Sequence, residues 1–260
     1  MERLPLVLHG KRGIVFGASS KYSLGLIVAK SWMAAGASQV TIACETTELR
    51  DKVQSVAKKE GWWNDSSCRA VICNVNKDEE IERITASEVD MILHSVAYSP
   101  SSALRSGNLL QYSRGDFLKT METSAYSLLA IASRAKFSEA TGGSLTSLTF
   151  DASQRVVPGY GAMAPAKAAL ETLSRYLACE LGKKKVRVNC ISAGPINTPA
   201  ARGIANFQAM LENATQRNAL KRPVLPQEVA NTACFLASDL SSGITGEIIH
   251  VDCGENFTIS

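Results

Sequence analysis

Strand-like and helix-like segments alternate along the whole of this 260-residue chain. Short runs rich in β-branched residues are each followed by a longer segment whose apolar residues share one side. Such alternation, with short connectors, predicts a Rossmann-type α/β fold: a doubly wound parallel sheet with helices on both faces and right-handed crossovers. The expected strands are Ile14–Phe16, Gln39–Ala43, Arg69–Cys73, Met91–Val96, Ser144–Thr149, Val186–Ile191 and Ile248–Val251. The expected helices are Leu24–Ala35, Thr47–Glu60, Lys77–Ala86, Asp116–Lys136 and Tyr160–Leu181.

Length and composition suit a single domain over residues 1–260. Apolar residues make up 45% of the chain and charged residues 20%, as in soluble globular proteins. No apolar run reaches the roughly 18 residues of a membrane span, and the N-terminus lacks the shape of a signal peptide. The seven cysteines are dispersed without a C-x-x-C pair, so we expect reduced thiols and no metal site. These features together predict a cytoplasmic protein that does not bind membranes.

The net charge of +4 is mild, and one dense basic run, Lys183–Lys185 followed by Arg187, lies where a helix should lead into a strand. A solvated loop is the preferred interpretation of this run, and contact with nucleic acid is the alternative. We therefore expect no nucleic-acid partner.

The turn between the first expected strand and helix could hold a phosphate group. Gly17 would let the backbone turn sharply, and the small residues after it leave room for a pyrophosphate at the helix N-terminus. The spacing from Gly17 to Gly25 does not match the G-x-G-x-x-G fingerprint. An ordinary glycine-bearing turn is the alternative.

Tyr160 and Lys167 are seven residues apart in an expected helix, which places them about two turns apart and close to the same face. There the ammonium could bind a nicotinamide ribose and favour the phenolate. The phenol could hydrogen-bond an oxygen that gains negative charge during hydride transfer. By itself such a pair is better explained by chance, but it follows a possible dinucleotide-binding turn and several expected strands.

Two segments break the alternation. Tyr98–Ser113 is rich in serine and glycine and follows the C-terminal end of a strand, where such sheets bind ligands. Residues 197–216 have the pattern of a broken helix, which is typical of a lid over a substrate. A surface helix packed on the core is the alternative for the second segment.

Five motifs occur in the order found in a known superfamily, and they span nearly the whole chain. They are the turn Gly17–Ser23, the run His94–Pro100, the pair Tyr160-x6-Lys167, the segment Arg187–Thr198 and the turn Asp239–Glu247. Together they resemble the short-chain dehydrogenase/reductase superfamily, and most closely its divergent branch, the NADH-dependent enoyl-acyl-carrier-protein reductases. Ala164 occupies the place of the lysine in the superfamily's commoner Tyr-x3-Lys pair.

This resemblance implies reduction of the 2,3-double bond of a trans-2-enoyl thioester by hydride from NADH, the last step of a fatty-acid elongation cycle. It also implies an acyl-carrier protein or CoA as the carrier of the substrate. A homotetramer is implied as well, with Asp116–Lys136 and Tyr160–Leu181 at a subunit interface. Two alternatives stay open: a short-chain reductase acting on another enone or ketone, and a catalytically silent nucleotide-binding relative.

The resemblance also assigns roles to individual residues. Tyr160 and Lys167 would be catalytic: Tyr160 would hydrogen-bond the thioester carbonyl and stabilise an enolate, which is then protonated at the α-carbon, and Lys167 would hold the nicotinamide ribose. Cofactor-binding residues would be Gly17, Ser23, Leu24, Glu45, Asn74, Val75, Ser95, Val96, Ala97, Lys167, Ile196 and Thr198. Substrate-binding residues would be Tyr98, Phe150, Tyr160, Ala200, Ile204 and Phe207.

The choice of cofactor depends on the end of the second expected strand. Glu45 would accept hydrogen bonds from the adenosine ribose and repel a 2′-phosphate, which favours NADH. A shift by one residue would place Cys44 there instead, so NADPH is the alternative. Asn74 replaces the acid that usually accepts from the adenine amino group, and an amide oxygen can accept without charge.

Some positions depart from the family pattern. Phe150 stands where most members have a second tyrosine; Ser147 is a less favoured candidate for the catalytic serine of ordinary members. The expected basic places on the lid are occupied by Ala205, Gln208 and Ala209. Electrostatic steering of an acidic carrier protein would therefore be weak, and a CoA thioester remains open.

Overall fold

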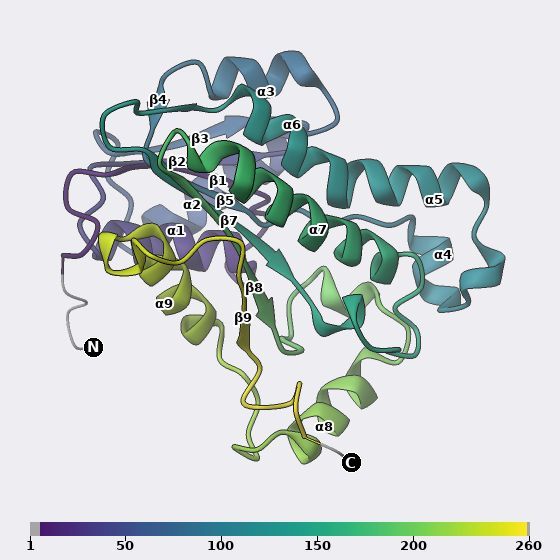
Figure 1. Ribbon diagram of the computed structural model, residues 1–260. Helices are drawn as coiled ribbons and strands as arrows, with labels where there is room; N and C mark the ends of the chain where they lie inside the picture. The colour runs from purple at the N-terminus through teal and green to yellow at the C-terminus, as the bar shows by residue number, and fades with distance from the viewer. Residues whose placement is uncertain (1–5, 259–260) are drawn as a thin grey trace.

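The structure is a computed structural model and describes residues 6–258. Its central feature is a seven-stranded sheet in the order β3-β2-β1-β5-β7-β8-β9, with every pair parallel (Figure 1). The strands are β1 Arg12–Phe16, β2 Gln39–Cys44, β3 Cys68–Ile72, β5 Met91–His94, β7 Gly143–Thr149, β8 Val186–Ala193 and β9 Ile248–Val251. The order reverses direction after β1, as in doubly wound dinucleotide-binding folds. The predicted fold class is confirmed.

Helices cover both faces of this sheet (Figure 1). Helices α1, α2 and α9 pack on one face, and α3, α6 and α7 pack on the other. The helices are α1 Leu24–Ala34, α2 Thr47–Lys59, α3 Asp78–Ile84, α4 Ser101–Ser106, α5 Arg114–Met121, α6 Ser127–Arg134, α7 Met163–Gly182, α8 Phe207–Arg217 and α9 Pro226–Ala237. Within residues 6–258, no helix is long and apolar enough to cross a membrane.

Shorter elements connect these layers. Strands β4 Glu88–Val89 and β6 Lys136–Phe137 form a separate parallel pair. Single 3₁₀ turns occur at η1 Leu109–Gln111, η3 Asp151–Ser153, η4 Ala201–Gly203 and η5 Asp239–Ser241, and a π-helical turn at η2 Glu122–Tyr126.

Two large apolar clusters lie one on each face of the sheet, and a third, smaller cluster forms around Tyr160. Val15 of β1 belongs to one cluster, and its neighbours Ile14 and Phe16 belong to the other. Successive strand residues point to opposite faces. A parallel strand covered by helices on both faces is therefore largely apolar, as β1 is from Ile14 to Phe16, and such a strand is recognisable in the sequence as an apolar run.

The long helix predicted over Asp116–Lys136 is present from Arg114 to Arg134, but it is not α-helical throughout and ends before Lys136. The structure divides it into α5, the π-helical turn η2 and α6, and Lys136 already belongs to β6. In the π turn, Ser124 Oγ accepts a hydrogen bond from the Tyr98 N–H (2.9 Å) and donates one to the Tyr98 carbonyl (3.0 Å). A helix widened by one residue at a functional segment is a common use of a π turn.

Two other helices differ from the prediction: one in where it begins, and one in being present at all. The helix expected from Tyr160 begins at Met163, because Gly161 has a positive φ of 55° that an α-helix cannot contain. Helix α9 was not predicted, although Pro226 at its first position and Glu228, which accepts from the Leu225 N–H at 2.8 Å, are typical start signals.

Gly13 in β1 provides a test of how tightly the sheet packs against helix α1. A Cβ atom there would lie 2.7 Å from Trp32 Cε3 and 2.9 Å from Met91 Cε. We expect Gly13→Ala to lower the free energy of unfolding by about 1–3 kcal/mol because the core would be overpacked. Urea denaturation at one fixed protein concentration measures this change. Gly182→Ala is the matched control, since its added Cβ would meet no atom within 4 Å; equal losses in both variants would contradict the packing described.

Candidate active site

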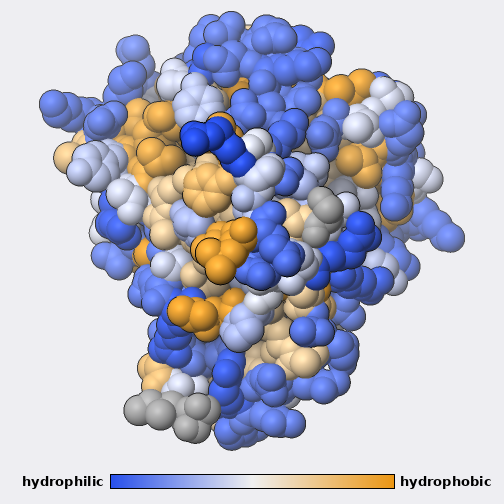
Figure 2. Space-filling view, turned by 90° about the vertical axis from the view of Figure 1, so that its right-hand side faces the viewer, coloured by the Kyte–Doolittle hydropathy of each residue, from blue (hydrophilic) through white to orange (hydrophobic). Residues whose placement is uncertain are grey.

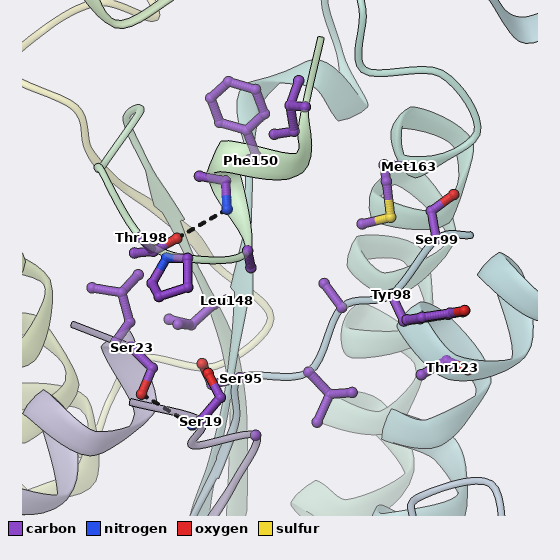
Figure 3. A pocket seen from close by; sticks show the side chains of 18 of the residues that line it. Ser19, Ser23, Ser95, Tyr98, Ser99, Thr123, Leu148, Phe150, Met163 and Thr198 are labelled. Atoms are coloured by element: carbon purple, nitrogen blue, oxygen red, sulfur yellow. Dashed lines mark hydrogen bonds between the residues drawn. The ribbon is translucent and has the colours of Figure 1, made fainter. Parts of the chain in front are cut away.

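A cavity of about 480 Å³ opens at the carboxyl ends of the parallel strands (Figure 3). Its wall includes Gly17 after β1, Glu45 after β2, Ser95 after β5 and Phe150 after β7. In open parallel sheets ligands bind at this edge, where the strand order reverses. The volume is in the usual range for a small-molecule site, roughly 300–1,000 Å³.

Every residue predicted to contact cofactor or substrate lines this cavity. These are Gly17, Ser23, Leu24, Glu45, Asn74, Val75, Ser95, Val96, Ala97, Tyr98, Phe150, Tyr160, Lys167, Ile196, Thr198, Ala200, Ile204 and Phe207. Lining residues that sequence reasoning missed include Ser99, Lys119, Thr123 and Met163. Met163 is the first residue of α7 and follows Tyr160 closely in the chain, which could have marked it as a neighbour of the site. Thr123 had no such signal, because it lies in the π turn.

The turn after β1 fits against the exit of β5. Gly17 has a φ of +94°, and a Cβ there would collide with the carbonyl oxygen of Ser95. Ser23, the N-cap of α1, accepts hydrogen bonds from the N–H groups of Ser19 (3.2 Å) and Ser20 (3.3 Å) (Figure 3). The first N–H groups of a helix have no partner within it, so this turn offers backbone donors to an anion in the cavity.

The ends of β2 and β3 resolve two points left open by the sequence. Cys44 is fully buried, whereas Glu45 is exposed and lines the cavity, so the residue available at the end of β2 is the glutamate and not the cysteine. Asn74 Oδ1 accepts a hydrogen bond from the Asn76 N–H at 2.9 Å. One lone pair of that oxygen therefore remains for a further donor.

Tyr160 is almost fully buried, with 7% of its surface exposed. Its ring lies 5.0 Å from the ring of Phe150, with a tilt of 54° between them. Burial raises the pKa of Tyr160 above its ordinary value, so the side chain is a neutral phenol at neutral pH. This differs from the expected bias toward the phenolate, because burial of the hydroxyl disfavours its charged form.

Lys167 connects α7 to the end of β7. Its buried ammonium donates a 2.8 Å hydrogen bond to the carbonyl of Leu148. Burial lowers the pKa of Lys167 to about 8, and the neighbouring Cys190 and Glu171 oppose this effect. One turn further along α7, Glu171 accepts a 2.7 Å hydrogen bond from Thr149 Oγ1.

Two other buried polar residues, Ser147 and His94, contact side chains of the protein interior and do not line the cavity. Ser147 Oγ lies 3.3 Å from Ser174 Oγ and 3.1 Å from Cys190 Sγ, which directs it into the interior. His94 Nε2 lies 2.7 Å from Ser127 Oγ, and burial lowers the pKa of His94 to about 3, so the ring is neutral. Across residues 6–258 no group of His, Cys, Asp and Glu is arranged to hold a metal ion.

The predicted lid segment contains η4 and α8, joined near Ile204. Ala200, Ile204 and Phe207 line the cavity from this segment. Gln208 and Ala209 on α8 are exposed, so the outer surface of the helix is uncharged at these positions.

A Rossmann-type sheet whose carboxyl edge carries a glycine turn and a buried tyrosine–lysine pair has the arrangement of an oxidoreductase. The chain belongs to the enoyl-(acyl carrier protein) reductase family, whose family model matches residues 17–256.

Similar proteins cover nearly the whole chain. The chain is 38% identical over 254 residues to enoyl-[acyl-carrier-protein] reductase [NADH] 1 of Rhizobium meliloti, covering 95% of this chain and 91% of that protein. It is 38% identical over 257 residues to the NADH-dependent FabI of Bacillus subtilis, covering 96% and 98%. Among solved structures, FabI from Candidatus Liberibacter asiaticus matches with a TM-score of 0.90 at 36% identity, covering 99% of both chains. The reductase of Anaplasma phagocytophilum in complex with NAD matches at 0.88 and 34%, covering 98% and 97%.

Proposed function

We propose that the protein is an NADH-dependent enoyl-[acyl-carrier-protein] reductase. It reduces the 2,3-double bond of a trans-2-enoyl thioester, the last step of a fatty-acid elongation cycle. The observation that carries this proposal is that a neutral, buried phenol, Tyr160, and the buried ammonium of Lys167 line the same cavity as the anion-binding turn at Gly17.

The cavity residues fit a dinucleotide. The turn at Gly17 closes on Ser95 without space for a side chain, which leaves the N-terminus of α1 open to a pyrophosphate. Glu45 suits the adenosine ribose and disfavours a 2′-phosphate. The remaining contacts would come from Ser23, Leu24, Asn74, Val75, Val96, Ala97, Ile196 and Thr198, with Lys167 at the nicotinamide ribose. When bound, NADH supplies hydride to the β-carbon of the substrate.

Tyr160 supplies the hydrogen-bond donor for the reaction. Because its pKa is raised, the phenol retains its proton and can donate to the thioester oxygen. Negative charge develops on that oxygen, so the hydrogen bond is stronger in the transition state than in the ground state. The resulting enolate takes a proton from solvent at its α-carbon, so one hydride and one proton are added across the double bond. Phe150 packs against the Tyr160 ring and fixes its orientation.

The acyl chain of the substrate would lie among the apolar lining residues, namely Tyr98, Phe150, Ala200, Ile204 and Phe207. We assign residues 197–216 as a lid over this chain. The exposed lid positions Gln208 and Ala209 are uncharged, so steering of an acidic carrier protein relies on other surfaces. Acyl-carrier-protein thioesters are the proposed substrates, with CoA thioesters as alternative carriers.

The assembly proposed is a homotetramer, with α5, α6 and α7 at a subunit interface. Leu118 and Tyr126 on the α5–η2 segment are 59% and 49% exposed. Figure 2 views the side of the molecule on which α4 and α5 lie, and hydrophobic patches interrupt its largely hydrophilic surface. Sedimentation should give the mass of four chains, and a monomer would contradict the assembly.

The cytoplasm is the proposed compartment, in keeping with seven unpaired cysteines.

Replacement of Tyr160 by phenylalanine tests the role of the phenol. Loss of an oxyanion donor should lower kcat by a factor on the order of 10²–10³ while NADH binding is retained. NADH oxidation is measured with crotonyl-CoA and with an enoyl thioester of acyl-carrier protein. Ser147→Ala is the control, because Ser147 faces the interior, and its kcat should stay close to that of the wild type. An active Tyr160→Phe enzyme would contradict the assignment.

Lys167 should make cofactor binding depend on pH. With a pKa of about 8, the ammonium loses its proton as the pH rises through that value. The affinity for NADH should therefore weaken above pH 8, as followed by fluorescence titration. Lys167→Met should bind weakly at every pH and lack this transition. A wild-type affinity that is equal on both sides of pH 8 would refute the role of the ammonium.

A further inference from the structure

The chain segment from α4 to Tyr112 lies against the turn that carries Tyr160, on both sides of that residue. Before Tyr160, a Cβ on Gly107 would lie 2.9 Å from Gly159 Cα. After Tyr160, a Cβ on Gly161 would lie 2.7 Å from the Tyr112 hydroxyl oxygen and 2.9 Å from its ring. Both neighbours of Tyr160 are therefore in contact with this segment.

The Tyr112 hydroxyl is attached to the cavity wall. It lies 3.2 Å from Ser99 Oγ, which also accepts a 3.1 Å hydrogen bond from Thr120 Oγ1. Ser99 is buried and lines the cavity on the same side as Tyr98 and Met163 (Figure 3). The Tyr112 ring thus joins two parts of the site: the segment after β5 and the turn before α7.

The turn itself is held by long backbone hydrogen bonds. The Tyr160 N–H bonds to the Val157 carbonyl at 3.2 Å, the Met163 N–H to the Tyr160 carbonyl at 3.3 Å and the Ala164 N–H to the Gly161 carbonyl at 3.2 Å. Gly159 and Gly161 have φ values of +85° and +55°, in a region that glycine enters freely. Contacts with neighbouring segments therefore contribute to the direction in which Tyr160 enters the cavity.

We propose that Tyr112 is a positioning residue for Tyr160: its phenol, anchored at Ser99, bears on Gly161 and fixes the turn from which Tyr160 reaches the substrate. The proposal rests on the proposed function, in which Tyr160 donates to the thioester oxygen. A reacting group displaced by about 1 Å can cost up to 10²-fold in rate. Loss of the Tyr112–Ser99 hydrogen bond should accordingly lower kcat, because it displaces Tyr160, and should leave the binding of NADH unchanged.

Steady-state kinetics of Tyr112→Phe, Ser99→Ala and the double variant test the hydrogen bond between the Tyr112 hydroxyl and Ser99. Each single variant should lower kcat on the order of tenfold, with the affinity for NADH unchanged. The double variant should lose no more than Ser99→Ala alone, because Tyr112→Phe removes a hydrogen bond that Ser99→Ala has already removed. Tyr176→Phe is the matched control: it makes the same chemical change on α7 at a side chain that does not line the cavity and is 69% exposed in the single chain, and kcat should be unchanged. An unchanged kcat in Tyr112→Phe, or losses that multiply in the double variant, would overturn the proposal.

A second readout does not depend on turnover. In protein labelled with ¹³C on its six tyrosines, Tyr160→Phe identifies the ring signal of Tyr160. That signal should shift in Tyr112→Phe and stay in place in Tyr176→Phe. If the wild-type protein does not turn over enoyl thioesters but the Tyr160 signal still shifts in Tyr112→Phe, the proposed function is refuted and the positioning role is upheld. An unshifted Tyr160 signal refutes the positioning role whether or not the enzyme is active.

Discussion

The site depends on the attachment of helix α7 to the end of strand β7. Lys167 donates a 2.8 Å hydrogen bond to the Leu148 carbonyl, and Glu171 accepts one of 2.7 Å from Thr149. A buried ammonium without partners would be strongly unfavourable, so the helix cannot move away from the strand without a large cost. The two residues that flank this attachment, Phe150 after β7 and Tyr160 before α7, are consequently held with their rings 5.0 Å apart.

Burial acts in opposite directions on the two reactive groups of the cavity. It raises the pKa of Tyr160 and keeps the phenol protonated, and it lowers the pKa of Lys167 to about 8. The same burial therefore gives a neutral hydrogen-bond donor at Tyr160 and, below about pH 8, a cation at Lys167, as the proposed roles of the two residues require. Both side chains are buried, so each hydrogen bond counts for more than it would at the surface.

Much of the fold and site could be predicted because parallel strands buried on both faces are continuous apolar runs, and functional residues follow their carboxyl ends. The expected strand Ile248–Val251 is present with the same bounds, and Glu45 and Phe150 line one cavity as anticipated. The π turn at Glu122–Tyr126 has no counterpart in hydrophobic periodicity, because it depends on the contact of Ser124 with Tyr98. The protonation of Tyr160 likewise depends on burial, which only tertiary packing determines.

The fate of a label on the cofactor tests the reaction most directly. With NADH that carries deuterium at the transferred position of C4 and crotonyl-CoA in ordinary water, the product is isolated and its deuterium located by NMR. In the proposed reaction, hydride reaches the β-carbon while the Tyr160 phenol donates a hydrogen bond to the thioester oxygen. This predicts one deuterium on the β-carbon of a saturated thioester. Deuterium on the carbonyl carbon, or a product that retains the double bond, would contradict the account and favour a carbonyl reductase.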